Sequence, residues 1–210
     1  IAGVGGGFDY GSAGPTHHGI EDVGVLRLQT GLTILAPADP AQARTILLDT
    51  WDRPGPIYYR LGKDDRTFVS GLDGRFQMGR SEVLRRGEDL LLLVSGSLTL
   101  EALAACDELR AAGIHATLAL VSTLSPVPAA DLRERLEGFA KVVTIEAHHA
   151  AGGLGTIVAE VIAENGLACR LIRLGVREGA DGRSGSLRYL LDRHGLSKEA
   201  IVAAARNAVG

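Results

Sequence analysis

The fold class can be predicted from residues 89–113, DLLLLVSGSLTLEALAACDELRAAG. Residues 89–95 are an expected strand whose continuous apolar run, residues 90–94, is typical of a strand buried on both faces of a parallel sheet. Apolar residues then recur at positions 98, 102, 105, 109 and 112, a spacing that indicates one face of an α-helix. Gly113 follows as the expected helix terminator. A buried strand followed by an amphipathic helix predicts the first half of a βαβ unit.

The same alternation continues through the rest of the chain. We expect strands at residues 114–121, 142–146 and 168–174, and helices at residues 128–139, 154–162, 187–194 and 197–208. Strands separated by helices predict right-handed βαβ connections and a mainly parallel sheet. Residues 88–210 are therefore predicted to form a complete, doubly wound α/β domain.

The pattern of residues 1–62 predicts only the C-terminal part of a second α/β domain. Strands are expected at residues 1–4, 33–36 and 56–60, with helices at residues 18–28 and 40–51. Asp39 is the expected N-cap of the second helix, with Pro40 at its first position. Residues 63–87 are polar and lack periodicity, so they are interpreted as a linker with some strand at its end. Because the chain opens inside an expected strand, we interpret it as a truncated, proteolysed or natural subunit of a larger enzyme.

The bulk composition excludes several classes of protein. With a net charge of −3, the chain has no excess of positive charge of the kind that binds nucleic acid or an anionic membrane surface. The apolar run at residues 90–94 is far shorter than the about 20 residues that a membrane span needs. Cys106 and Cys169 lie in different predicted elements, so no disulfide framework is expected, and a cytoplasmic location is the default.

The most informative loop is GGGFDYGSAGPTHHGIED, residues 5–22. Its glycines do not complete a dinucleotide fingerprint, because Phe8 stands where the last glycine is required. A Gly-Pro turn presents Thr16, His17 and His18 just before an acidic segment. Histidine can bond to a substrate, or exchange protons with it, near neutral pH. Chemistry alone leaves open whether this pair serves a substrate or only local hydrogen bonding.

Three further stretches extend the pattern across the chain. The pyrimidine-binding domain of transketolases is similar to two stretches, the GPTHHGIED of the loop and LTILAPAD at residues 32–39. The double histidine most resembles transketolases that are made of two separate subunits. PIYYRLG at residues 56–62 is similar to the strand that ends that domain. EAHHAAGGLG at residues 146–155 resembles the C-terminal domain of the family, a motif shared with deoxyxylulose-phosphate synthases and 2-oxo acid dehydrogenase beta subunits.

The resemblance implies a transferase that moves a two-carbon ketol unit between sugars or sugar phosphates. By motif position, His17 takes the catalytic role of the histidine that faces the substrate. Arg60 takes the role of the arginine that contacts the sugar phosphate or distal hydroxyls, and His18 is a second substrate-binding candidate. Ala13 replaces an aspartate of single-chain relatives, and Gly5-Gly6 replaces a His-Asp pair. These losses leave room for a specialised sugar or a keto acid donor.

The resemblance also implies thiamine diphosphate and Mg²⁺ as cofactors, held mainly by another domain or subunit. We therefore assign no cofactor-binding residue and no metal ligand in this chain. The chain is expected to need an N-terminal transketolase domain or subunit for activity, and to homodimerise. Two alternatives stay open: a beta-subunit-like component of a 2-oxo acid dehydrogenase or a deoxyxylulose-phosphate synthase type enzyme, and a non-catalytic structural or dimerisation fragment.

The segment 146–155 carries two weaker hypotheses. Glu146, His148 and His149 are metal-ligating residue types, but no further ligand with a standard spacing accompanies them. The glycines of residues 152–155 precede an expected helix, whose first N–H groups could bind an anion. Close approach of two backbone segments is the alternative reason for these glycines.

Overall fold

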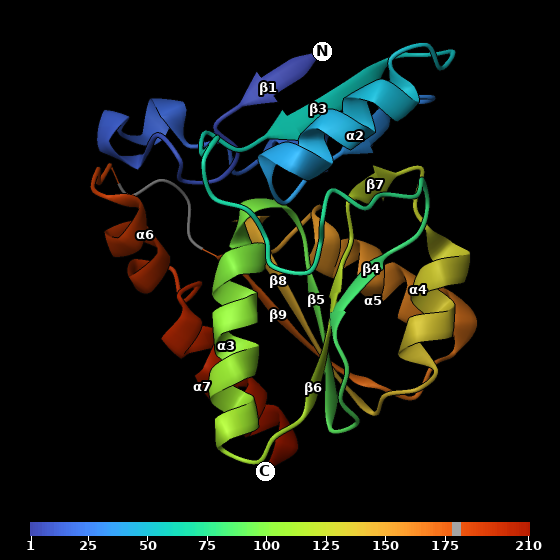
Figure 1. Cartoon of the computed structure of the whole chain (residues 1–210), viewed down its shortest axis with the longest axis vertical. Helices are drawn as coiled ribbons and strands as arrows, with labels where there is room; N and C mark the ends of the chain where they lie inside the picture. The colour runs from blue at the N-terminus through green and yellow to red at the C-terminus, as the bar shows by residue number, and fades with distance from the viewer. Residues whose placement is uncertain (178–181) are drawn as a thin grey trace.

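The computed structural model describes residues 1–177 and 182–210 and contains two sheets. Figure 1 shows residues 1–61 gathered at one end of the molecule, above the second, larger sheet. This arrangement places the loops of residues 1–61 against the end of a strand of the larger sheet.

The larger sheet confirms the predicted doubly wound α/β architecture. Its strand order is β4-β6-β5-β8-β9, and all neighbours are parallel except the pair β4 and β6. Helices cover both faces, α3, α6 and α7 on one side and α4 and α5 on the other (Figure 1). The bounds are β4 Glu82–Arg85, β5 Leu90–Val94, β6 Ala116–Leu120, β8 Lys141–His149, β9 Arg170–Val176, α3 Thr99–Ala111, α4 Ala129–Leu136, α5 Leu154–Asn165, α6 Leu187–Arg193 and α7 Lys198–Val209.

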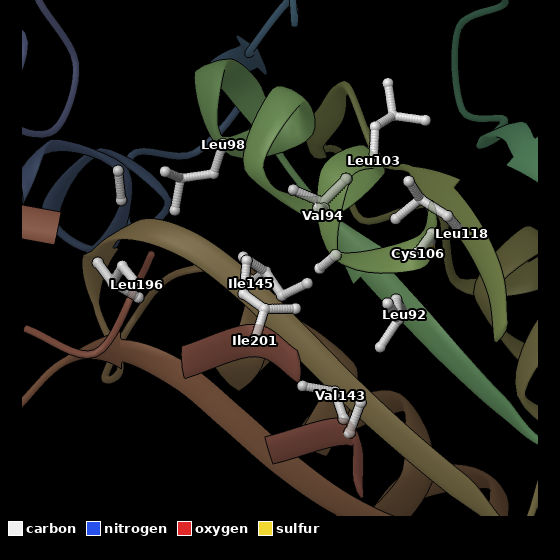
Figure 2. Close-up of a cluster of buried hydrophobic side chains, with 14 of the residues drawn as sticks. Leu92, Val94, Leu98, Leu103, Cys106, Leu118, Val143, Ile145, Leu196 and Ile201 are labelled. Atoms are coloured by element: carbon white, nitrogen blue, oxygen red, sulfur yellow. The ribbon is translucent and has the colours of Figure 1, made fainter. Parts of the chain in front are cut away.

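The central strand β5 explains why an uninterrupted apolar run was needed. Leu92 and Val94 pack into the core beneath α3 and α7, together with Ile201 (Figure 2). Leu91 and Leu93 point to the opposite face and pack with α4 and α5. All five residues of β5 are 0% exposed. Burying each leucine contributes about 1.5–3 kcal/mol of transfer free energy.

The smaller sheet has the order β1-β3-β2-β7, and its last strand comes from the second half of the chain. The strand β7 pairs antiparallel with β2, whereas β1 and β2 pair parallel with β3. The sequence did not predict β7, because three residues are too few to display an alternating pattern. The bounds are β1 Ala2–Val4, β2 Thr33–Leu35, β3 Ile57–Leu61 and β7 Thr123–Ser125, with three short 3₁₀ helices at Gly11–Ala13 (η1), Pro15–His17 (η2) and Gly96–Leu98 (η3).

Helix α2 (Pro40–Thr50) begins as predicted, but the helix expected at residues 18–28 starts later and is shorter than predicted. Asp39 caps α2 by accepting the Gln42 N–H at 2.7 Å. In the earlier segment only α1 (Asp22–Leu26) is α-helical. Gly19 instead pairs with Gly7 through two backbone hydrogen bonds of 2.7 and 2.9 Å, which holds the chain extended there. That pairing competes with helical hydrogen bonding and delays the start of the helix.

Candidate functional site

The Gly-rich loop leaves the carboxyl end of β1 and is closed at its base by the pairing of Gly7 with Gly19. Within it, His17 is exposed, and its Nδ1 lies 2.9 Å from the Thr16 hydroxyl. His18 is half-buried, with Nε2 3.4 Å from the Gly11 carbonyl oxygen and its ring edge-on to Phe8. His17 is therefore accessible to a ligand, whereas His18 is held inside the loop.

Arg60 lies at the base of this loop, not on its surface. Only 6% of it is exposed. Its Nη2 donates to the carbonyl oxygens of Gly19 at 2.6 Å and of Ala147 at 2.9 Å, and its Nε donates to Asp22 at 2.8 Å. The structure thus joins Arg60 to the loop that carries His17 and to the end of β8, although no direct contact between Arg60 and His17 is present among the described residues.

Asp22 and Tyr58 complete this cluster, and the sequence interpretation missed both. The Tyr58 hydroxyl donates to the same Asp22 oxygen as Arg60, at 2.8 Å. Burial alone would raise the pKa of Asp22, but the charge and hydrogen bond of Arg60 outweigh it and hold the pKa low. Burial and the Asp22 carboxylate raise the pKa of Tyr58. A usable signal did exist: Tyr58 and Arg60 are two positions apart on a strand, so their side chains share one face.

Glu146 occupies the helix N-terminus whose N–H groups the sequence analysis considered able to bind an anion. Its two oxygens accept the N–H groups of Leu154 at 2.7 Å and Gly155 at 2.8 Å, at the start of α5. The group bound there is thus the protein's own carboxyl group. The close-approach explanation also applies to one glycine, since a Cβ on Gly152 would lie 2.7 Å from the Gly24 Cα.

The two histidines that follow Glu146 bind backbone atoms. His148 is buried, and its Nε2 accepts the Gly24 N–H at 3.1 Å while its Nδ1 lies 2.8 Å from the His149 carbonyl oxygen. This arrangement needs a neutral ring with the proton on Nδ1, and burial lowers the pKa of His148 accordingly. His149 Nδ1 lies 3.2 Å from the Val176 carbonyl oxygen. Across residues 1–177 and 182–210, no group of three or more metal-ligating side chains could hold a metal ion.

Burial raises the pKa of Glu146 to about 7, although the N–H groups of Gly155 and Leu154 oppose the rise. A carboxyl group whose pKa is higher in the folded state stabilises the fold below its unfolded pKa and loses that contribution as pH rises through the folded value. The free-energy difference between the wild type and Glu146→Gln should therefore fall by about 3 kcal/mol from pH 4.5 to pH 8. Urea unfolding across this range measures it. A pH-independent difference would show that folding does not raise the pKa of Glu146.

A cavity of about 530 Å³ opens beside the carboxyl ends of β2 and β3. Asp9, Leu61, Ser97 and Leu100 are among its lining residues. Ligands of open α/β sheets gather at this edge. None of His17, His18 and Arg60 lines this cavity. The cavity and the candidate residues are therefore neighbours at one edge, not one site.

Comparison with known proteins decides the family. The model of the transketolase C-terminal domain matches residues 79–201, and that of the transketolase pyrimidine-binding domain matches residues 1–66. The chain belongs to the transketolase family. The two matches follow one another along the chain in the order that the sequence predicted. Among the described residues, no helix is long and apolar enough to cross a membrane.

Several transketolase relatives are similar over most of the chain. One subunit of an apulose-4-phosphate transketolase from Phocaeicola vulgatus is 34% identical over 204 residues, which cover 96% of this chain and 65% of the relative. A putative transketolase C-terminal section from Methanocaldococcus jannaschii is 33% identical, over 93% of this chain and 61% of its own length. A solved structure described as a split gene transketolase, inactive beta4 tetramer, is 33% identical with a TM-score of 0.85, covering 100% of this chain and 65% of that one. The chain thus spans less than two thirds of the length of these relatives.

Proposed function

We propose that this chain is the C-terminal part of a transketolase-type transferase that moves a two-carbon ketol unit between sugars or sugar phosphates. The observation that carries the proposal is the ordered match of both transketolase domains over residues 1–66 and 79–201, with an exposed His17 on the loop that follows β1. It is supported by relatives named as subunits of apulose-4-phosphate and 6-deoxy-6-sulfo-D-fructose transketolases, the latter from a Clostridium species and 36% identical over 91% of this chain and 59% of its own length.

In this proposal each candidate residue has a role that its surroundings permit. His17 is the catalytic residue, because its accessible ring can exchange a proton with the substrate or hydrogen-bond to it. His18 supports the substrate from the inner side of the loop. Arg60 is only 6% exposed, so the substrate phosphate role that the motif gives it would depend on its Nη1, which lies beside glycines: a Cβ would be 3.1 Å away at Gly6 and 3.9 Å away at Gly96.

The transketolase family depends on thiamine diphosphate, and we propose that another domain or subunit holds this cofactor and its Mg²⁺. The described residues do not fit the diphosphate and its metal. Their helix N-terminus at Leu154 is already filled by Glu146, and they contain no cluster of three metal-ligating side chains. We therefore assign no step of the reaction to the cofactor in this chain.

The partners proposed are an N-terminal transketolase polypeptide and a second copy of this chain. Exposed apolar side chains on the first half support a missing protein neighbour: Trp51 is 73% exposed at the end of α2, next to the half-exposed Leu48. The related structure described as a beta4 tetramer supports self-association. The two cysteines are unpaired, which supports a cytoplasmic location.

The test is complementation with the N-terminal subunit of a related split transketolase. We expect the isolated chain to bind thiamine diphosphate weakly and to turn over no ketose, because the residues that hold the cofactor are elsewhere. Adding the complementary polypeptide should restore both properties. Calorimetry in the presence of Mg²⁺ measures binding, and a coupled assay measures ketol transfer. Tight Mg²⁺-dependent binding by the isolated chain would refute the shared active site.

The second candidate is a deoxyxylulose-phosphate synthase type reaction. Such an enzyme from Dechloromonas aromatica is 34% identical over 93% of this chain, although the match covers only 31% of that enzyme. The same complemented enzyme distinguishes the two when it is given either a ketose or pyruvate as the only donor. Turnover with pyruvate as the only donor, and none with the ketose, would favour the second candidate.

A further inference from the structure

The base of the histidine loop is a point where three segments of the chain meet. The pairing of Gly7 with Gly19 closes the loop, and the Gly19 carbonyl oxygen accepts hydrogen bonds both from Gly7 and from Arg60. The same Arg60 nitrogen also donates to Ala147, near the end of strand β8. Arg60 therefore ties the loop to the second sheet through a single buried group.

Asp22 determines how that group is oriented. A guanidinium is planar and rigid, so fixing its Nε also fixes the directions of its Nη hydrogens. Asp22 accepts from Nε at 2.8 Å and is in turn held by the Tyr58 hydroxyl at 2.8 Å. With this edge fixed, Nη2 points to the two carbonyl oxygens, and the Nη1 edge stays between Gly6 and Gly96.

We propose that Asp22 is a positioning residue, which acts through Arg60 to hold the base of the His17 loop against β8. The proposal rests on the proposed function only for its effect on catalysis. Asp22 does not touch the substrate in this scheme. Tyr58 supports it by fixing the carboxylate oxygen that Arg60 uses.

Geometry favours this role over simple charge balance. Both donors converge on the Asp22 Oδ2, and the buried Oδ1 has no hydrogen-bond partner in the described part of the chain. A carboxylate placed only to neutralise Arg60 could pair through both oxygens, as in a bidentate ion pair. Here one oxygen is used to aim the guanidinium, and Nη2 of that guanidinium donates to the backbone of the loop at Gly19 and of β8 at Ala147.

The first experiment uses hydrogen exchange on the isolated chain, so it does not depend on activity. Asp22→Asn should speed exchange of the loop segment 5–19 by about 10- to 100-fold, the size of a lost charged hydrogen bond, while exchange in β5 and β6 stays unchanged. Tyr58→Phe is a milder variant and should give a smaller change in the same segment. Asp49→Asn, an exposed aspartate on α2, is the matched control and should give none.

Unchanged exchange at the loop in both Asp22→Asn and Tyr58→Phe overturns the proposal. So does faster exchange spread evenly over both sheets, because that result describes general destabilisation.

The second experiment uses the complemented enzyme. Asp22→Asn should lower kcat by about 10- to 100-fold, because a displaced loop misplaces His17, while the affinity for thiamine diphosphate stays at the wild-type value. Combining Asp22→Asn with Arg60→Ala should lower kcat no further than Arg60→Ala alone, since both changes break one chain of contacts. Additive losses in the double variant overturn the coupling through Arg60. If the wild type shows no ketol transfer, the proposed function fails, and the exchange experiment still decides the role of Asp22.

Discussion

Replacing His17 by alanine should lower kcat of the complemented enzyme by about 10²- to 10⁴-fold, the usual contribution of a positioned proton-transfer group. The ring is exposed, and its Nδ1 lies 2.9 Å from the neighbouring Thr16 hydroxyl. Nε2 is therefore the ring nitrogen left to meet a substrate. Steady-state kinetics with a ketose donor measure the loss.

The stability of the chain should hardly change in His17→Ala. Substitutions of exposed side chains outside special structural features usually stay within about 0.5 kcal/mol. His115→Ala is the matched control, because His115 is also exposed but lies at the start of β6, away from the loop. The control should keep wild-type kcat. A His17→Ala enzyme with more than half of the wild-type kcat would remove His17 from the catalytic role.

The fold could be predicted where a residue pattern is compatible with only one structural element. An unbroken apolar run such as Leu90–Val94 fits a central strand covered on both faces, and the following helical stripe leaves the βαβ arrangement as the compact choice. Strand β7 could not be predicted in this way. It exists because Ile34 and Leu35 present an open strand edge to residues 123–125, a tertiary contact that leaves no periodic trace in three residues.

The candidate site could also be predicted only in part. The roles of His17 and Arg60 came from family resemblance, since a histidine pair and a strand arginine have several chemical uses. The partners of Arg60 depend on long-range packing: Asp22 lies 38 positions away and Ala147 lies 87 positions away. A single sequence cannot show such pairings. It did show that the glycines before α5 need an explanation, and the structure supplies it in Gly24, which approaches Gly152, and in Glu146, which approaches Gly153.

Gly153→Ala should be the most destabilising single-methyl substitution that we consider. Gly153 is the residue just before α5, and its backbone has φ −92°, which alanine can adopt. The obstacle is space. A Cβ at this position would overlap the Glu146 carboxyl group and would lie 2.8 Å from the His148 Nδ1. Both side chains are buried and fixed by hydrogen bonds, so neither can move aside at low cost.

Two losses then add in Gly153→Ala. Overpacking a buried site costs about 1–3 kcal/mol, and a buried carboxyl group pushed away from the Leu154 and Gly155 N–H groups costs about 1–3 kcal/mol more. We expect a total of about 3 kcal/mol or more, measured by urea unfolding at pH 7. Gly138→Ala is the control, since the nearest atom to its added Cβ would be the Arg135 carbonyl oxygen at 3.8 Å, and it should stay within about 1 kcal/mol of the wild type. If Gly153→Ala unfolds at the wild-type urea concentration, Glu146 does not occupy the start of α5, and the pH dependence expected of Glu146 fails with it.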